Sequence, residues 1–387
     1  MNEDNKNSNG IVDVVEDFDY STQNESYNKR FRKWRSDKDN PFAFNFTANK
    51  NEKVYVESKG FVDHSFEGAE KESLSRIFYV IGIAALIWVV IEDVLGRAGI
   101  AGFAAFGFNI HTNFFNSAVY GGSMEIVTAL VAISVLKVAV PGIYAHYRFR
   151  LPRKVEFMNR LNSSLALLGA IAMTLIVCTA VSLPSAYSSE SKEIYDYFRS
   201  IDADLKVWDQ KEFLVYTIFD VIIMSIISEM FFRGAMFGAL RQFGDPFAIV
   251  MTALTAGLLT QDLREMPAAI LVSLVAGYGM VSSGTMFTAI AVSIVYKMYN
   301  LALLILETDR TEKMPLTRNI FMMTALAAGI IGFFIFWMCF VRKKKGNIAV
   351  YRSDIPKWRR IVVSAKTFPY SAVVFICLIY AAMRLTL

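Results

Sequence analysis

Ionisable side chains inside long apolar stretches are the residues of this chain best placed to do chemistry. Glu229 and Arg233 lie four positions apart in one such stretch, so on a helix they share a face and can form an ion pair. Lys297 follows Ser293 by one helical turn in another stretch, a spacing that suits a Ser–Lys pair with the lysine as base. An ionised group inside a membrane is costly unless it is paired or hydrated, so each of these residues is a candidate site residue.

The other charged residues in or beside these stretches have simpler interpretations. Asp220 precedes Glu229 by two and a half α-helical turns, and we expect it on the opposite face as a packing or hydration residue. Lys137 and Lys297 lie deeper in their stretches, and Lys297 needs a carboxylate or a ring of carbonyl oxygens. Glu92 and Asp93 lie at the end of their stretch, where termination of the span is the simplest explanation.

Helices of membrane-spanning length must position these residues. The chain has 387 residues, is 54% hydrophobic and 19% charged, and has a mean hydropathy of +0.37, whereas soluble domains are about 45–50% apolar and about 25% charged. A transmembrane helix needs roughly 20 apolar residues, so we predict an all-α polytopic membrane protein with about 8–9 spans. The expected spans are 74–95, 124–146, one within 161–189, 213–240, 246–261, 267–282, 285–306, 319–341 and 367–386.

The same pattern divides the chain into four parts. A polar, largely disordered tail (1–73) precedes the first span and a Gly- and Phe-rich segment that we expect to be re-entrant or interfacial (74–119). A helical core (120–306) and additional C-terminal spans (307–387) follow. Basic residues concentrate in the tail, in the loop after the second span and in 342–366, which predicts a cytoplasmic N-terminus in the plasma membrane.

The tail contains a segment, NKRFRKWRSDK, in which basic and aromatic residues alternate. Its composition is typical of a solvated charge run in a disordered arm. The alternative is contact with anionic lipid headgroups through its basic side chains, Lys29, Arg30, Arg32, Lys33 and Arg35. Further along, the segments FAFNF and KVYVES flank TANKNE and predict a small hairpin.

Cysteine, histidine and net charge exclude several classes of function. The three cysteines (Cys178, Cys339 and Cys377) are far apart, so we expect neither a disulfide framework nor a Cys-based metal site. No histidine follows His146. A net charge of +5 is too small to indicate a nucleic-acid-binding protein. We therefore expect no cofactor, no metal and no nucleic acid, and the lipid bilayer as the surroundings.

The fourth span and the segments after it resemble a known family. The sequence IISEMFFRGAMFGALRQFG resembles the EExxxRG motif of the CAAX prenyl protease 2, bacteriocin-processing and lysostaphin-resistance family of membrane endopeptidases. AIVMTALTAGLLTQD resembles the helix that carries FxxxH in that family, and AGYGMVSSGTMFTAIAVSIVYKMYN resembles the segment that carries HxxxN. The resemblance covers about residues 120–306 and implies a CAAX-protease-like helical core.

Most of the family's reactive positions differ in this sequence. The resemblance implies paired glutamates as base and ligand, and two histidines that hold a metal or an oxyanion. The first glutamate is replaced by Ser228, FxxxH by Ala256 and Thr260, and HxxxN by Ser293 and Lys297, while Glu229 and Arg233 are kept. Since hydroxyls are poor zinc ligands and one carboxylate cannot complete a tetrahedral site, this pattern predicts a protein that is inactive as a metalloprotease.

Lys297 offers a positive charge that could compensate the buried carboxylate of Glu229. We hypothesise that its ammonium group replaces the charge of the metal and pairs with Glu229, which preserves the helix arrangement without catalysis. The leading interpretation is a catalytically degenerate family member that binds or regulates a partner, such as a membrane or envelope protein of a bacterial cell.

Two other functions stay open at this stage. One is an active intramembrane endopeptidase that uses Glu229 as base with a serine nucleophile, or the Ser293–Lys297 dyad. The other is a transporter whose path is lined by charged residues of the spans, namely Lys137, Asp220, Glu229 and Lys297.

Overall fold

The computed structural model describes residues 11–12, 23–37, 40–42, 46–47, 53–56, 60–63, 66–112, 119–158, 160–187, 210–308, 314–342, 348 and 355–386. Helices dominate this part of the chain, as the sequence predicted. The helices before residue 200 are α1 (Glu25–Ser36), α2 (Phe66–Val90), η2 (Ile91–Leu95), α3 (Gly96–Ala105), α4 (Ser123–Phe149), α5 (Arg153–Glu156) and α6 (Ser164–Tyr187). The strands form three two-stranded antiparallel pairs, β1 (Ile11–Val12) with β2 (Phe46–Thr47), β3 (Lys53–Val56) with β4 (Gly60–Asp63), and β5 (Ile110–Thr112) with β6 (Val119–Gly121).

The second half of the described chain begins with one long, uneven helix. Its consecutive pieces are α8 (Gln210–Ile218), η4 (Phe219–Met224), α9 (Ser225–Glu229), η5 (Met230–Met236), α10 (Phe237–Leu240) and η6 (Arg241–Phe243). The pieces η4 and η5 are π-helical, with wider turns than an α-helix. The helices that follow are α11 (Asp245–Leu258), α12 (Glu265–Ser283), α13 (Met286–Thr308), α14 (Met314–Phe336), η7 (Trp337–Val341), α15 (Lys357–Ala365) and α16 (Phe368–Thr386).

Seven described helices are long and apolar enough to cross a membrane. They are Glu67–Ala105, Met124–Phe149, Ser164–Leu183, Leu214–Phe243, Glu265–Ser283, Met286–Leu306 and Leu316–Val341, and an eighth span results if α15 and α16, bent by 85°, are counted together. The prediction of an all-α polytopic membrane protein is confirmed. The segment expected to span at 246–261 forms α11, which at 14 residues is shorter than a bilayer crossing requires.

The first span differs from its expected form. The sequence pattern ends it near residue 95, but the helix continues through η2 and α3 to Ala105, so the Gly-rich stretch continues the helix.

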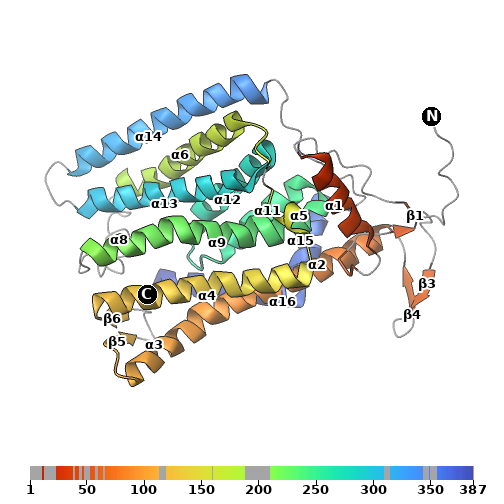
Figure 1. The fold of residues 1–387 in the computed structure, drawn as a ribbon, viewed down its shortest axis with the longest axis horizontal. Helices are drawn as coiled ribbons and strands as arrows, with labels where there is room; N and C mark the ends of the chain where they lie inside the picture. The colour runs from red at the N-terminus through yellow and green to blue at the C-terminus, as the bar shows by residue number, and fades with distance from the viewer. Residues whose placement is uncertain are drawn as a thin grey trace.

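The spans form two groups on either side of the long helix 210–243 (Figure 1). On one side α6 packs against α12, α13 and α14, and on the other α2 packs against α4 and α16. The long helix contacts both groups, through α4 at η5 and through α13 at α9 and η4. Side chains that project from it in opposite directions therefore meet different helices, and this decides which partners its charged residues find.

Helix α1 shows that part of the polar tail is packed against the bundle. Asn24 caps the helix by accepting a hydrogen bond from the Tyr27 amide at 2.8 Å. Tyr27, Phe31 and Trp34 follow at helical spacing and are all buried, and the Trp34 indole donates to the Phe149 carbonyl at 2.9 Å. Neither interpretation of this segment from the sequence included a helix packed on the core.

Two of the expectations for the tail need correction. Arg35 is fully buried, so it does not belong among the side chains available to lipid headgroups, whereas Lys29, Arg30, Arg32 and Lys33 are exposed on α1. The hairpin expected between FAFNF and KVYVES has a different pairing, because β3 pairs with β4 and β2 pairs with β1. The shorter separation in sequence favours the observed pairing: residues 57–59 separate β3 from β4, whereas residues 48–52 separate β2 from β3.

The close approach of α2 and α16 gives a test of this arrangement. A Cβ added at Gly82 would lie 2.4 Å from the Tyr370 amide nitrogen and 2.7 Å from the Pro369 carbonyl carbon. We predict that Gly82→Leu separates these helices and lowers the free energy of unfolding in detergent by about 1–3 kcal/mol, the usual cost of overpacking. Gly99→Leu is the control, since nothing lies within 4 Å of the position of its Cβ. Equal melting temperatures for the two variants would contradict the packing of α16 on α2.

Candidate functional site

Glu229 lies at the centre of a buried polar cluster formed by three helices. Its carboxylate Oε1 accepts a hydrogen bond from the Ser293 hydroxyl of α13 at 2.5 Å. Arg233, one turn along the same helix, places Nη1 at 3.2 Å from Oε1 and 3.1 Å from Oε2. Arg233 Nη2 also donates to the Ser273 hydroxyl at 2.7 Å and to the Ser273 carbonyl at 2.8 Å, which brings in α12.

Burial makes the charges of this cluster depend on one another. Glu229 and Arg233 each expose only 3% of their surface, and Ser273 exposes 5%. In such surroundings an unpaired carboxylate or guanidinium group costs several kcal/mol, so neither charge is tolerated without the other. The predicted i, i+4 ion pair of Glu229 and Arg233 is present. Ser273 is a contributor that the sequence interpretation missed, because one serine among many in apolar helices has no distinguishing spacing.

Lys297 has a different partner from the one expected. Its ammonium group lies 2.7 Å from the Asp220 carboxylate Oδ1 and donates to the Asp220 carbonyl at 2.9 Å. The hypothesis of a Lys297–Glu229 ion pair is therefore wrong as a direct contact, although Lys297 is close enough to Glu229 for an electrostatic interaction. The expectation that Asp220 faces away assumed 3.6 residues per turn throughout. The π-helical turns of η4 intervene, so that count does not hold between Asp220 and Glu229.

The remaining family-equivalent positions make local hydrogen bonds. The Ser228 hydroxyl donates to the Ser225 carbonyl at 3.2 Å, within its own helix. Thr260 lies just beyond the end of α11 and donates to the Gly257 carbonyl at 2.7 Å. Ala256 is apolar and packs against the main core. The structure thus brings together Glu229, Arg233 and Ser293 and places Lys297 beside them.

The residues at this site do not fit a metal. A tetrahedral zinc site requires three or four nitrogen, sulfur or carboxylate ligands. Around Glu229 the available groups are a guanidinium, an ammonium nearby and hydroxyls, and the two cations would repel a metal ion. Within the described residues, no three His, Cys, Asp or Glu side chains are grouped so that they could hold one.

The glycine that follows Arg233, Gly234, leaves space for the Glu156 side chain. A Cβ at this position would lie 3.3 Å from the Glu156 Cγ, so the absence of a side chain lets Glu156 pack against the long helix. Glu156 is buried and its Oε2 lies 2.6 Å from the His146 Nδ1. Burial raises the pKa of the Glu156 carboxyl, while the nearby His146 opposes that shift. This pair lies outside the family-equivalent positions and was not identified from the sequence.

A second polar cluster joins the first two spans. Lys137 lies 2.7 Å from the Glu92 carboxylate, which also accepts a hydrogen bond from the Trp88 indole at 3.0 Å. Asp93 is buried and accepts a hydrogen bond from Gln261 at 2.9 Å. Glu92 and Asp93 therefore do not terminate the span, since the helix continues past them and both side chains have partners within the bundle.

The charged residues proposed as a transport path are divided among separate pairs. Lys137 pairs with Glu92, Lys297 with Asp220, and Glu229 with Arg233. Each ion pair is formed between side chains at short distance: Lys137–Glu92 and Lys297–Asp220 connect different helices, and Glu229–Arg233 lies within one helix.

The fold and this cluster define a polytopic helical membrane protein with a buried Glu–Arg pair on a long central helix. Comparison with known families agrees with the resemblance seen in the sequence. Residues 210–299 match the family described as Rce1-like: Type II CAAX prenyl endopeptidase Rce1-like. The match includes the long helix, α11, α12 and the first part of α13, and with them the family-equivalent positions. It supports the CAAX protease-like resemblance, and the apolar helices indicate an integral membrane protein. Neither the search of curated proteins nor the search of solved structures found a match.

The pairing of Lys297 gives a quantitative test. We predict that the double-mutant cycle of Asp220→Asn and Lys297→Met shows a coupling on the order of 1 kcal/mol in detergent unfolding, as expected for residues in contact. The matched cycle of Glu229→Gln and Lys297→Met should show a smaller coupling, because these side chains interact only at longer range. Additive effects in the first cycle with strong coupling in the second would instead restore the Lys297–Glu229 pair.

Proposed function

We propose that this protein is a catalytically degenerate CAAX protease-like membrane protein that binds or regulates a membrane or cell-envelope protein. The observation that carries the proposal is the environment of Glu229. Its carboxylate is held by Arg233 and by the Ser293 hydroxyl in a site with 3% exposure, so its charge is already compensated by groups of the protein itself.

The substituted positions support the same conclusion. The positions equivalent to the two histidines hold Thr260, which bonds within its own turn, and Ser293, which is hydrogen-bonded to Glu229. The position equivalent to the motif asparagine holds Lys297, which is paired with Asp220. The contacts of Ser293 and Lys297 join the long helix to α13. The polar groups of the former site thereby stabilise the arrangement of the helices.

The proposed orientation has a cytoplasmic N-terminus in the plasma membrane. Helices α1, α5 and α15 lie at the same end of the bundle (Figure 1) and carry or adjoin the most basic segments of the chain. The positive-inside rule assigns that end to the cytoplasm. There the exposed basic side chains of α1, Lys29, Arg30, Arg32 and Lys33, would face an acidic partner or lipid headgroups.

A proteolysis and metal assay tests the proposal. The detergent-purified protein is incubated with an isoprenylated CAAX peptide, and cleavage and zinc content are measured beside Glu229→Gln. We expect no cleavage above that of the variant and no stoichiometric zinc in either sample, because the ligand set is absent. Cleavage or bound zinc that is lost in Glu229→Gln would contradict catalytic degeneracy.

One observation favours a second candidate, acyl transfer through Ser293. Its hydroxyl donates to Glu229 at 2.5 Å, the geometry of a nucleophile and its base. In this reaction Ser293 Oγ would attack the peptide carbonyl while Glu229 accepts its proton, and the C–N bond would break as the amine leaves with a proton. The Ser293–Lys297 dyad is disfavoured, since Lys297 donates to Asp220.

Covalent labelling separates this candidate from the first. A fluorophosphonate probe should not label the wild-type protein if Ser293 only stabilises Glu229. Labelling that disappears in Ser293→Ala and persists in Ser228→Ala would establish Ser293 as a nucleophile. Ser228 is a matched control because it is half-buried on the same helix bundle and bonds only to a backbone carbonyl in the described contacts.

A further inference from the structure

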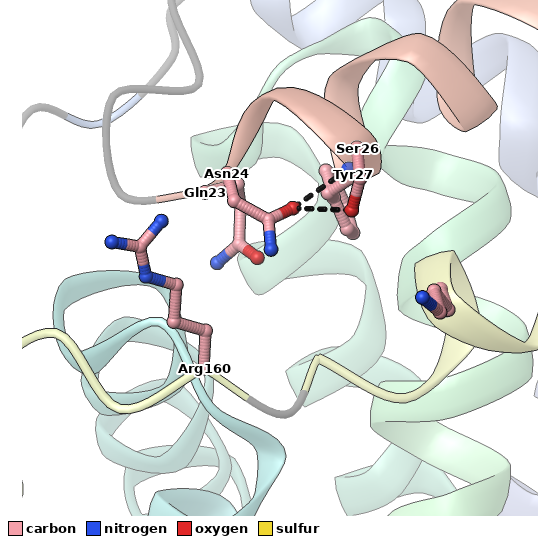
Figure 2. A pocket seen from close by; sticks show the side chains of 6 residues that line it. Gln23, Asn24, Ser26, Tyr27 and Arg160 are labelled. Carbon is pink, nitrogen blue, oxygen red and sulfur yellow. Dashed lines mark hydrogen bonds between the residues drawn. The ribbon is translucent and has the colours of Figure 1, made fainter.

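A small polar pocket lies between the start of α1 and the segment that links α4 to α6. It has a volume of about 60 Å³ and is lined by Gln23, Asn24, Ser26, Tyr27, Lys154 and Arg160. Figure 2 shows the Arg160 side chain extending toward Gln23 and Asn24 at the start of the α1 helix. Every lining side chain carries a polar group, so the pocket is unsuited to an apolar ligand.

The neutral wall of the pocket is held in place by hydrogen bonds. Gln23 is 9% exposed and donates to the Gly284 carbonyl, at the turn between α12 and α13, at 3.1 Å. Asn24 Oδ1 accepts from the Ser26 hydroxyl at 2.9 Å as well as from the Tyr27 amide. The Tyr27 hydroxyl accepts from Arg241 Nη1 at 2.7 Å. The pocket is therefore built on side chains with fixed positions, and little ordering is required when a ligand binds.

The two charged residues that line the pocket are both basic. Lys154 and Arg160 are both exposed, and within the described part of the chain neither has a carboxylate partner. The one carboxylate of α5, Glu156, faces His146. Arg241, which donates to the Tyr27 hydroxyl, forms an ion pair with Asp245. The negative group closest in sequence to the pocket is Glu25, which is exposed at the start of α1 and does not line the pocket.

We propose that this pocket binds a phosphate group. An arginine fork and a lysine ammonium are the side chains most often used to bind phosphate oxygens, and the amide NH2 groups of Asn24 and Gln23 supply further donors. The size agrees: a buried water needs roughly 10–15 Å³ on the same measure, so the pocket accommodates about five heavy atoms, the number in a phosphate group.

The location suggests two sources of the phosphate. The pocket lies at the end of the bundle formed by the C-terminal end of α4, α5 and the α12–α13 turn, where a lipid headgroup can reach it. A free phosphate or a soluble phosphorylated metabolite would enter from the water at the same end. Both present the same phosphate oxygens to Lys154 and Arg160, and the source is a question for experiment.

Binding to the purified full-length protein tests the proposal. Protein in a neutral detergent is titrated with phosphatidylglycerol, with phosphatidylcholine and with inorganic phosphate, and affinity is measured by native mass spectrometry and by the shift in melting temperature. The test variant is Lys154→Gln with Arg160→Gln. The control variant, Arg148→Gln with Lys357→Gln, removes the same charge from exposed residues that do not line the pocket.

We expect the wild type and the control variant to bind one phosphate-bearing ligand within threefold of each other, and the pocket variant to bind at least tenfold more weakly. Binding of phosphatidylglycerol that inorganic phosphate does not displace identifies a lipid headgroup, and binding of inorganic phosphate alone identifies a soluble source. Equal weakening in both variants, or no change in the pocket variant, would overturn the proposal. Both pocket substitutions replace exposed side chains, and unchanged melting temperatures without ligand verify that the variants fold.

Discussion

A carboxylate buried in an apolar helix bundle must be neutralised, and this requirement organises the centre of the protein. Glu229 satisfies it with Arg233 from its own helix and with Ser293 from α13, while Arg233 also donates hydrogen bonds to Ser273 on α12. Three helices are thus tied together at one depth. Removal of one member of such a pair leaves an uncompensated buried charge. A single substitution in the cluster therefore lowers the free energy of unfolding by more than the intact pair contributes to it.

The wide turns of the long helix distribute the other charges. The turns of η4 precede the Glu229 turn, and Asp220 meets Lys297 of α13 there. Further from this site, Lys137 and Glu92 join α4 to the first span. These two pairs connect different helices, whereas Glu229 and Arg233 pair within one helix. The ionisable residues of the spans are therefore accounted for by separate short-range contacts.

Hydropathy and motif spacing were sufficient for most of the spans, for the Glu229–Arg233 pair and for the family resemblance, because each depends on local pattern alone. The partner of Lys297 was not accessible in this way, since it depends on π-helical turns that no residue in the segment signals. Helix α1 was missed for another reason: its basic residues dominate the composition, although Tyr27, Phe31 and Trp34 have helical spacing. Ser273 was missed because only the tertiary structure distinguishes it from the other serines.

The packing of α16 on α2 has a consequence for biosynthesis. Tyr370 lies beside Gly82, so helices from opposite ends of the described chain are neighbours at the centre of one helix group. During membrane insertion α2 enters the bilayer long before α16 has been translated. The face of α2 around Gly82 therefore gains its α16 neighbour only near the end of synthesis. Assembly of this group is therefore a late event, and a nascent chain that stalls before α16 presents an incomplete bundle to the quality-control machinery of the membrane.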